Sequence, residues 1–342
     1  MPEPADPIAD AVTHVWRDVL GAHAAGLTFR EAGGDSLSML QIAFGLERRL
    51  GRVVLDGEMS ADVRADVRAA DLIERLVTNP PPAVEPAIGV QTIVVLPGVL
   101  GSEPRLIEFQ QRLAASATVL PVWYPPWPEL IGSAATFGII VDAVLDQIAA
   151  AAEQQPLVLV GYSLGGGVAH AVAWELERRG HPPRFVALLD TNDVRNKPPE
   201  PPLSPPARLR RITTHARTAG LRRALAFRIG WRLAWLAVAV PAVLPLVARF
   251  RDRLPIPTDF AYEFDASLTR FVRIRLALAA RPRPILARVT LYRTAETNPA
   301  VRDLGWGAAT PNLTIEDTLG DHEDMIVGAA GDDLARRILT AM

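Results

Sequence analysis

The chain has 342 residues, a hydrophobic content of 49% and a formal net charge of −2 at pH 7. This length suggests about two domains with sizeable cores, and the absence of cysteine excludes disulfides, cysteine nucleophiles and cysteine-ligated metal sites. The acidic N-terminus, Met1–Asp6, lacks an apolar run. We therefore expect no signal peptide, a cytoplasmic location and no metal centre.

Charge is distributed unevenly along the chain. Residues 1–78 carry 13 acids and 8 bases, whereas residues 194–253 carry 13 bases and 2 acids. Segments of opposite charge attract each other. No nucleic-acid-binding motif accompanies the basic segment, so nucleic acid is not an expected partner.

The first part of the chain has helical periodicity. Apolar residues recur at helical spacing over residues 6–20, 36–50 and 70–78, which predicts a small helical bundle over residues 1–78. Four prolines between Asn79 and Pro86 predict a semi-rigid linker, here taken as residues 79–89.

A serine in the first part stands at a predicted helix start. Ser36 follows Gly33-Gly34-Asp35 and precedes an amphipathic helix. The free N–H groups and the dipole at a helix N-terminus favour an attached phosphate, although the serine is also a suitable N-cap. The run Gly34-Asp35-Ser36-Leu37 also suggests a GDSL-type hydrolase, but no apolar strand precedes it.

Downstream of the linker, predicted strands and helices alternate, as in a parallel sheet with crossover helices. The predicted strands are Thr92–Leu96, Thr118–Val122, Leu157–Val160, Phe185–Leu189, Ile285–Tyr292 and Asn312–Ile315. The predicted helices are Arg105–Leu113, 137–152 and Gly167–Arg178.

This alternation is interrupted after Asp193 by a basic, apolar and mostly helical stretch, residues 194–277. It contains 16 consecutive uncharged residues, Leu233–Ala248, with prolines at 241 and 245. A membrane span needs about 20 apolar residues. We therefore expect a helical lid over an apolar tunnel, in preference to a segment that contacts a membrane.

The most informative motif is Gly161-Tyr162-Ser163-Leu164-Gly165, between a predicted strand and a predicted helix. This is the G-x-S-x-G nucleophile elbow of the α/β-hydrolases, which presents a serine hydroxyl at the edge of the sheet. The simpler interpretation is a glycine-rich turn that only packs. The surrounding strand and helix favour the elbow, with Ser163 as nucleophile.

Candidate partners of Ser163 follow it in the order acid, then histidine. Asp190 ends the next strand, with Glu296 and Asp193 as alternatives. Of the six histidines only His215 and His322 lie beyond Asp190, and His215 falls in the predicted lid. His322 is thus the expected general base, and Asp190 is expected to hold its tautomer.

The oxyanion hole requires two backbone N–H groups. We expect one from Leu164, the residue after the nucleophile, and the other from Val99 in the glycine-containing run that follows the first strand. Gly98 is the nearest alternative to Val99.

These motifs carry a family resemblance. Residues 6–78, with Phe29-x-x-x-Gly33-Gly34-Asp35-Ser36-Leu37, resemble a peptidyl carrier protein. Residues 90–342, with the Ser163 elbow, Leu189-Asp190 and Gly320-Asp321-His322, resemble the type I thioesterase that ends nonribosomal peptide synthetases. The run at 96–101 matches that family only loosely.

The resemblance implies that Ser36 carries 4′-phosphopantetheine, attached by a phosphopantetheinyl transferase. It also implies an upstream synthetase module or condensation domain, and release of a peptidyl or acyl chain by hydrolysis or macrocyclisation. The alternatives are an editing thioesterase or general serine esterase with a fused helical domain, a docking module with an inert hydrolase fold, and a protein anchored to a membrane surface by residues 233–248.

Overall fold

The structure is a computed structural model that describes residues 7–20, 24, 26–32, 42, 46, 67–78, 91–101, 104–132, 135–193, 221–250, 258–297 and 300–342. The chain divides into two compact units, Met1–Glu85 and Pro86–Met342. Ser36, most of the helix predicted at 36–50 and the linker predicted at 79–89 lie outside the described residues.

The first unit contains helices α1 (Pro7–Leu20) and α4 (Ala69–Thr78), both at predicted positions. Their apolar faces meet in a small core in which the rings of Trp16 and Phe29 pack edge to face, with centroids 6.2 Å apart. A single antiparallel bridge joins Thr28 to Arg68. The carrier bundle itself stays a prediction.

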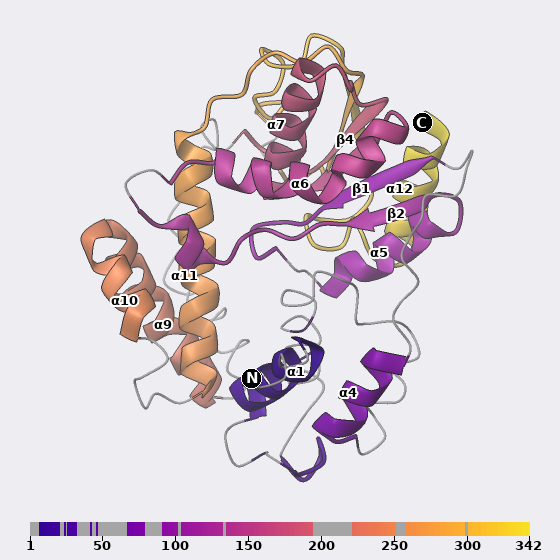
Figure 1. The fold of residues 1–342 in the computed structure, drawn as a ribbon. Coiled ribbons are helices and arrows are strands. Elements are labelled where there is room, and N and C mark those ends of the chain that lie inside the picture. Colours follow the sequence, from indigo (N-terminus) through magenta and orange to yellow (C-terminus); the bar gives the residue numbers. More distant parts are fainter. Residues whose placement is uncertain are drawn as a thin grey trace. The chain divides into compact units, whose positions relative to one another are not determined.

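The second unit is built on a six-stranded parallel sheet with the order β2-β1-β3-β4-β5-β6 (Figure 1). Its strands are β1 (Thr92–Leu96), β2 (Thr118–Pro121), β3 (Val158–Tyr162), β4 (Phe185–Leu189), β5 (Val289–Arg293) and β6 (Leu313–Asp317). Strands β1, β3, β4 and β5 are buried throughout, which explains their continuous apolar sequences.

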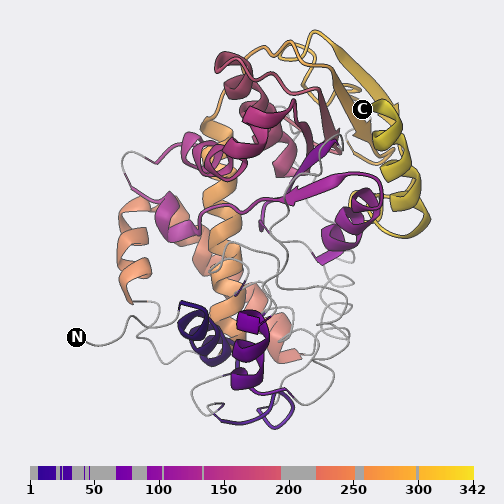
Figure 2. The same cartoon turned by 45° about the vertical axis from the view of Figure 1, so that its right-hand side comes forward.

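Helices cover both faces of the sheet (Figures 1 and 2). Helices α6 (Gly138–Gln154) and α7 (Leu164–Arg178) share one apolar core with alternate strand residues, and α5 (Pro104–Ala114) and α12 (Gly328–Ala341) share the other. A short 3₁₀ turn, η2 (Trp127–Leu130), precedes α6. This is the predicted α/β-hydrolase fold, in which the carboxyl ends of the parallel strands share one edge.

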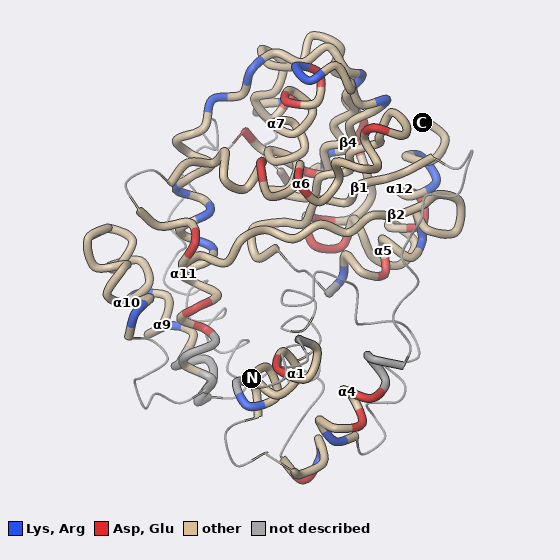
Figure 3. Tube along the Cα trace, viewed as in Figure 1, with Lys and Arg blue, Asp and Glu red and all other residues tan. Residues whose placement is uncertain are grey.

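Between β4 and β5 the chain inserts α9 (Leu221–Ala239), η3 (Pro241–Val243), α10 (Leu244–Phe250) and α11 (Thr258–Ala279). The prolines explain why the uncharged run is broken, since proline removes a helix hydrogen bond. Helices α9 and α10 contain arginines but no acidic residue. Figure 3 draws in blue those arginines that the structure describes. Among the described helices none alone has the length and apolarity to cross a membrane; one pair, Phe227–Ala239 and Pro241–Phe250, meets those criteria jointly but bends by 106°.

Most predicted boundaries agree with the structure to within two residues, but the starts of two elements differ by three or four. The strand predicted from Ile285 begins at Val289, because the Glu177 carboxylate accepts hydrogen bonds from the N–H groups of Leu286 and Ala287. The elbow helix begins at Leu164, one turn before the predicted Gly167. Its first glycines continue the helix and serve close packing, described below.

Candidate active site

The elbow places Ser163 at the edge of the sheet in a strained conformation. Ser163 lies between β3 and α7 with φ 54° and ψ −121°, a region that non-glycine residues rarely adopt. A Cβ on Gly161 would collide with the backbone of Gly165, and one on Gly165 with the carbonyl oxygens of Leu96 and Pro97. Both glycines of the motif are therefore sterically required.

The structure brings together three residues that are far apart in sequence. His322 Nε2 lies 3.1 Å from Ser163 Oγ, and His322 Nδ1 lies 2.7 Å from Asp190 Oδ2. With its proton on Nδ1, the imidazole donates to the carboxylate and accepts from the serine hydroxyl. An arrangement of this kind can withdraw the proton from a serine hydroxyl as its oxygen attacks a carbonyl carbon.

Asp190 is buried, with 1% of its surface exposed, and is surrounded by donors. The N–H and Oγ1 of Thr294 donate to Oδ1 at 2.9 and 3.2 Å, and Thr297 Oγ1 donates to Oδ2 at 2.6 Å. Burial alone raises the pKa of Asp190, but the hydrogen bonds from His322, Thr294 and Thr297 outweigh it and lower the pKa overall. The carboxylate therefore stays ionised at neutral pH.

Local turn chemistry presents His322. Asp321 Oδ1 accepts the N–H groups of Glu323 and Asp324 at 2.8 and 2.9 Å, which builds the turn that carries the histidine. Tyr162 stacks on the imidazole with centroids 5.1 Å apart and donates its hydroxyl to the His322 carbonyl at 2.8 Å. Sequence reasoning missed Tyr162, Thr294 and Thr297.

The other candidate residues lie elsewhere. Of the three candidate acids, Asp190 accepts the hydrogen bond from His322 Nδ1. Asp193 lies next to Leu304, whose carbonyl accepts the Asp193 N–H at 2.9 Å. Glu296 is exposed in the turn after β5. His215 and Ser36 lie outside the described residues. In the described part of the chain, no group of three or more His, Cys, Asp or Glu side chains is arranged to hold a metal ion.

The two expected oxyanion donors lie on adjoining segments. Leu164 is the first residue of α7, where the N–H groups have no acceptor within the helix. Val99 lies in a turn closed by a 3.1 Å hydrogen bond from the Gly101 N–H to the Gly98 carbonyl. Because Leu96 is in register with Gly161, this turn begins at the level of the elbow.

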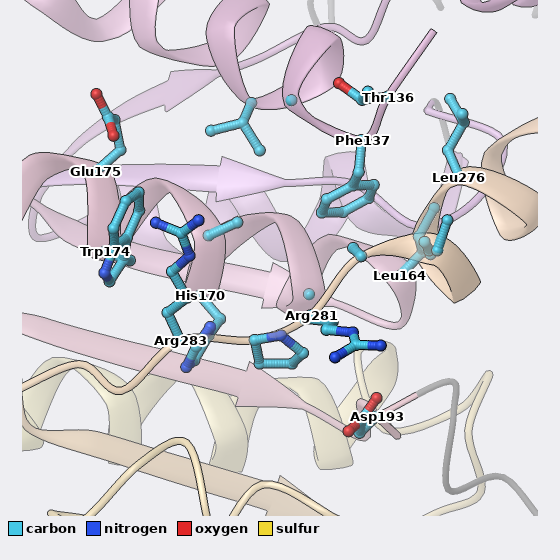
Figure 4. Close-up of a pocket in the computed structure, with 18 of the residues that line it drawn as sticks. Thr136, Phe137, Leu164, His170, Trp174, Glu175, Asp193, Leu276, Arg281 and Arg283 are labelled. Atoms are coloured by element: carbon cyan, nitrogen blue, oxygen red, sulfur yellow. The ribbon is translucent and has the colours of Figure 1, made fainter.

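A cavity of about 420 Å³ lies beside the elbow, between α7, the start of α6 and the end of α11 (Figure 4). Its walls are mainly apolar, including Phe137, Leu164, Trp174 and Leu276. Burial lowers the pKa of His170, which also lines the cavity, so that this imidazole is neutral at neutral pH. Leu164 lines the cavity, while Ser163, Asp190 and His322 do not.

Comparison with known proteins matches part of the chain to a family. Residues 91–217 match the model of the thioesterase domain family. The chain is 42% identical over 90 residues to the spectinabilin polyketide synthase system protein NorC of Streptomyces orinoci, covering 23% of this chain and 4% of that protein. It is 28% identical over 180 residues to enterobactin synthase component F of Escherichia coli K12, covering 49% of this chain and 13% of that protein.

A four-domain nonribosomal peptide synthetase solved with AMP and glycine aligns with a TM-score of 0.53 and 19% identity, over 99% of this chain and 26% of that chain. The chain therefore spans only a small part of these larger proteins. The resemblance to a thioesterase is confirmed by the family match. Residues 91–217 match the thioesterase domain family, and the unit that contains them has the α/β-hydrolase fold with a serine, a histidine and an aspartate in contact.

Proposed function

We propose that the chain is a carrier–thioesterase didomain that releases a peptidyl or acyl chain in nonribosomal peptide biosynthesis. The observation that carries this proposal is the chain of contacts from Ser163 Oγ through His322 to the buried Asp190. The similarity to parts of synthases supports the same role. Ser36 would carry 4′-phosphopantetheine, and an upstream synthetase module would supply the substrate.

When attached, the phosphopantetheine supplies a thiol that holds the acyl chain as a thioester. His322 Nε2 takes the Ser163 proton as Oγ attacks the thioester carbonyl, and the N–H groups of Leu164 and Val99 stabilise the oxyanion. The C–S bond breaks and His322 returns the proton to the thiolate, which leaves an ester on Ser163. Water or a nucleophile within the acyl chain then attacks that ester, with His322 again as base.

This proposal is tested by trapping the nucleophile. We expect a fluorophosphonate to add its mass to the peptide that contains Ser163 and to block hydrolysis of a small acyl thioester. Both effects should be absent in Ser163→Ala. Labelling on another peptide, or thioester hydrolysis that survives complete labelling of Ser163, would contradict the assignment.

The apolar cavity suggests where the acyl chain lies. Gly167 lines this cavity one turn after Ser163, and a Cβ there would meet no atom within 4 Å. Gly167→Leu is expected to shorten the available space without destabilising α7, since leucine favours helix more than glycine does. Excluding two methylenes should lower kcat/KM for long acyl thioesters by roughly tenfold, at about 0.8 kcal/mol per methylene.

The matched control is Ala150→Leu, which adds the larger side chain at an exposed site on α6. Hydrolysis of acetyl and dodecanoyl thioesters by the two variants should be compared. The cavity assignment requires that only Gly167→Leu discriminates between chain lengths. An equal loss on both substrates would place the acyl chain elsewhere.

A further inference from the structure

Arg273, on the inserted helix α11, is buried against the segment that carries the expected oxyanion donor. Only 2% of its surface is exposed. Its Nη1 donates to the Val99 carbonyl at 3.0 Å, and its Nη2 donates to the carbonyls of Pro125 at 3.0 Å and Tyr124 at 3.4 Å. One guanidinium thus joins two loops that follow β1 and β2.

The same loops are tied together by Tyr124. Its ring lies under the guanidinium, with Arg273 Cζ 5.2 Å from the ring centroid. Its hydroxyl donates to the Pro97 carbonyl at 2.8 Å, so Tyr124 holds the beginning of the turn while Arg273 holds its middle. Gly101, at the end of the turn, has φ 79°, a left-handed conformation that favours glycine, and a Cβ there would lie 2.5 Å from Arg273 Nη1.

Helix α11 contacts the second loop at another point. Asp265 Oδ1, two turns before Arg273, accepts a hydrogen bond from Trp127 Nε1 at 2.6 Å. Two polar anchors on one helix therefore fix the 124–127 segment, and Arg273 extends that anchoring to Val99. The backbone of the turn is closed by the hydrogen bond from the Gly101 N–H to the Gly98 carbonyl, and the side chains of Tyr124 and Arg273 hold it from outside at Pro97 and Val99.

We propose that Arg273 is a positioning residue for the oxyanion hole: it couples the inserted helix α11 to the Val99 turn and sets the direction of the donor in that turn. This inference rests on the proposed function, because it assigns Arg273 a role in the Ser163 reaction. Oxyanion stabilisation depends on donors that are already oriented when charge develops. A lysine is a poor substitute, since a single ammonium group lacks the planar fork that reaches several carbonyls.

The test compares Arg273→Gln and Arg273→Lys with Arg275→Gln, which alters an exposed arginine on the same helix. Each variant is assayed for kcat and KM with a small acyl thioester, and for inhibition by a trifluoromethyl ketone. This inhibitor forms a tetrahedral adduct with a serine and places an oxyanion where the substrate would. The unfolding midpoint is measured for each variant.

We expect Arg273→Gln to lower kcat by about 10- to 100-fold, less than the roughly 100- to 1000-fold loss on removing an oxyanion donor itself, with KM within about twofold. Affinity for the trifluoromethyl ketone should fall by the same factor as kcat/KM. Arg273→Lys should recover part of both. A merely structural role would lower the unfolding midpoint without this parallel loss, and the Lys variant keeps the test open if the Gln variant does not fold.

The outcomes separate this inference from the proposed function. If Ser163→Ala abolishes turnover while the Arg273 variants match Arg275→Gln in kcat and in inhibitor affinity, the positioning role is wrong and the proposed function stands. If Ser163→Ala turns over like the wild type, the proposed function fails and Arg273 has no oxyanion to position.

Discussion

Ser163→Ala is expected to lower kcat for acyl-thioester hydrolysis by about four to six orders of magnitude, leaving only the residual effect of binding and the oxyanion hole. The variant removes the oxygen that would become acylated. It keeps the elbow, whose geometry depends on Gly161 and Gly165, so the unfolding midpoint should stay near that of the wild type. The effect is measured with a purified acyl thioester in discontinuous assays. The enzyme concentration must be high enough to detect the small remaining activity.

The matched control is Ser116→Ala, an exposed serine in the turn before β2 that lies away from the site. It should retain wild-type kcat and KM. More than about a hundredth of wild-type kcat in Ser163→Ala would be incompatible with a covalent serine mechanism.

Asp190→Asn is expected to lower kcat by about 10⁴-fold, as does loss of the acid in other serine triads. The carboxylate accepts hydrogen bonds on both oxygens, from Thr294 and Thr297 as well as from His322. An amide offers one oxygen and an NH₂ group. When that NH₂ faces the imidazole, the histidine proton moves to Nε2 and the ring no longer accepts from Ser163.

Two further variants serve as controls, because each removes an alternative acid. Glu296→Gln and Asp193→Asn should keep kcat within about tenfold of the wild type, since neither carboxylate is the partner of His322 Nδ1. A loss of 10³-fold or more in either, with Asp190→Asn active, would reassign the acid.

Asp190 also predicts a pH dependence of stability. Its folded pKa is depressed below the ordinary value of 3.8, so ionisation stabilises the folded state above that pH. This contribution is lost as the pH falls from about 5 toward the folded pKa. Urea unfolding from pH 7 to pH 3 should therefore show a wild-type advantage over Asp190→Asn that shrinks on acidification, and an advantage that grows would contradict the lowered pKa.

Much of the fold could be predicted because its signals are local. Strands such as Thr92–Leu96 and Phe185–Leu189 are short apolar runs that end before a proline and an aspartate, and both have the predicted bounds. The strand predicted at Ile285–Tyr292 is present, but its predicted start was four residues too early, because the N–H groups of Leu286 and Ala287 bond to Glu177, more than 100 residues earlier in the chain. A local sequence pattern does not show that a distant carboxylate accepts these hydrogen bonds.

The same distinction between local and distant signals separates the site residues that could be predicted from those that could not. Ser163, Asp190 and His322 each follow a strand or its loop, and parallel strands deliver such residues to one edge of the sheet. Thr297 was missed because a hydroxyl residue in a loop has no distinctive pattern. Arg273 was missed because its acceptors are backbone carbonyls, which any sequence supplies.

The central claim is transfer of an acyl chain from the carrier serine to the hydrolase serine within this chain. The most direct test incubates the full chain with a phosphopantetheinyl transferase and an acyl-coenzyme A analogue, and follows the peptides containing Ser36 and Ser163 by mass spectrometry. We expect the acyl-arm mass on the Ser36 peptide first and the acyl mass later on the Ser163 peptide, with the acyl group retained at Ser36 in Ser163→Ala. An unmodified Ser36, together with acylation of Ser163 by a free thioester, would contradict the didomain account and favour a stand-alone thioesterase or esterase.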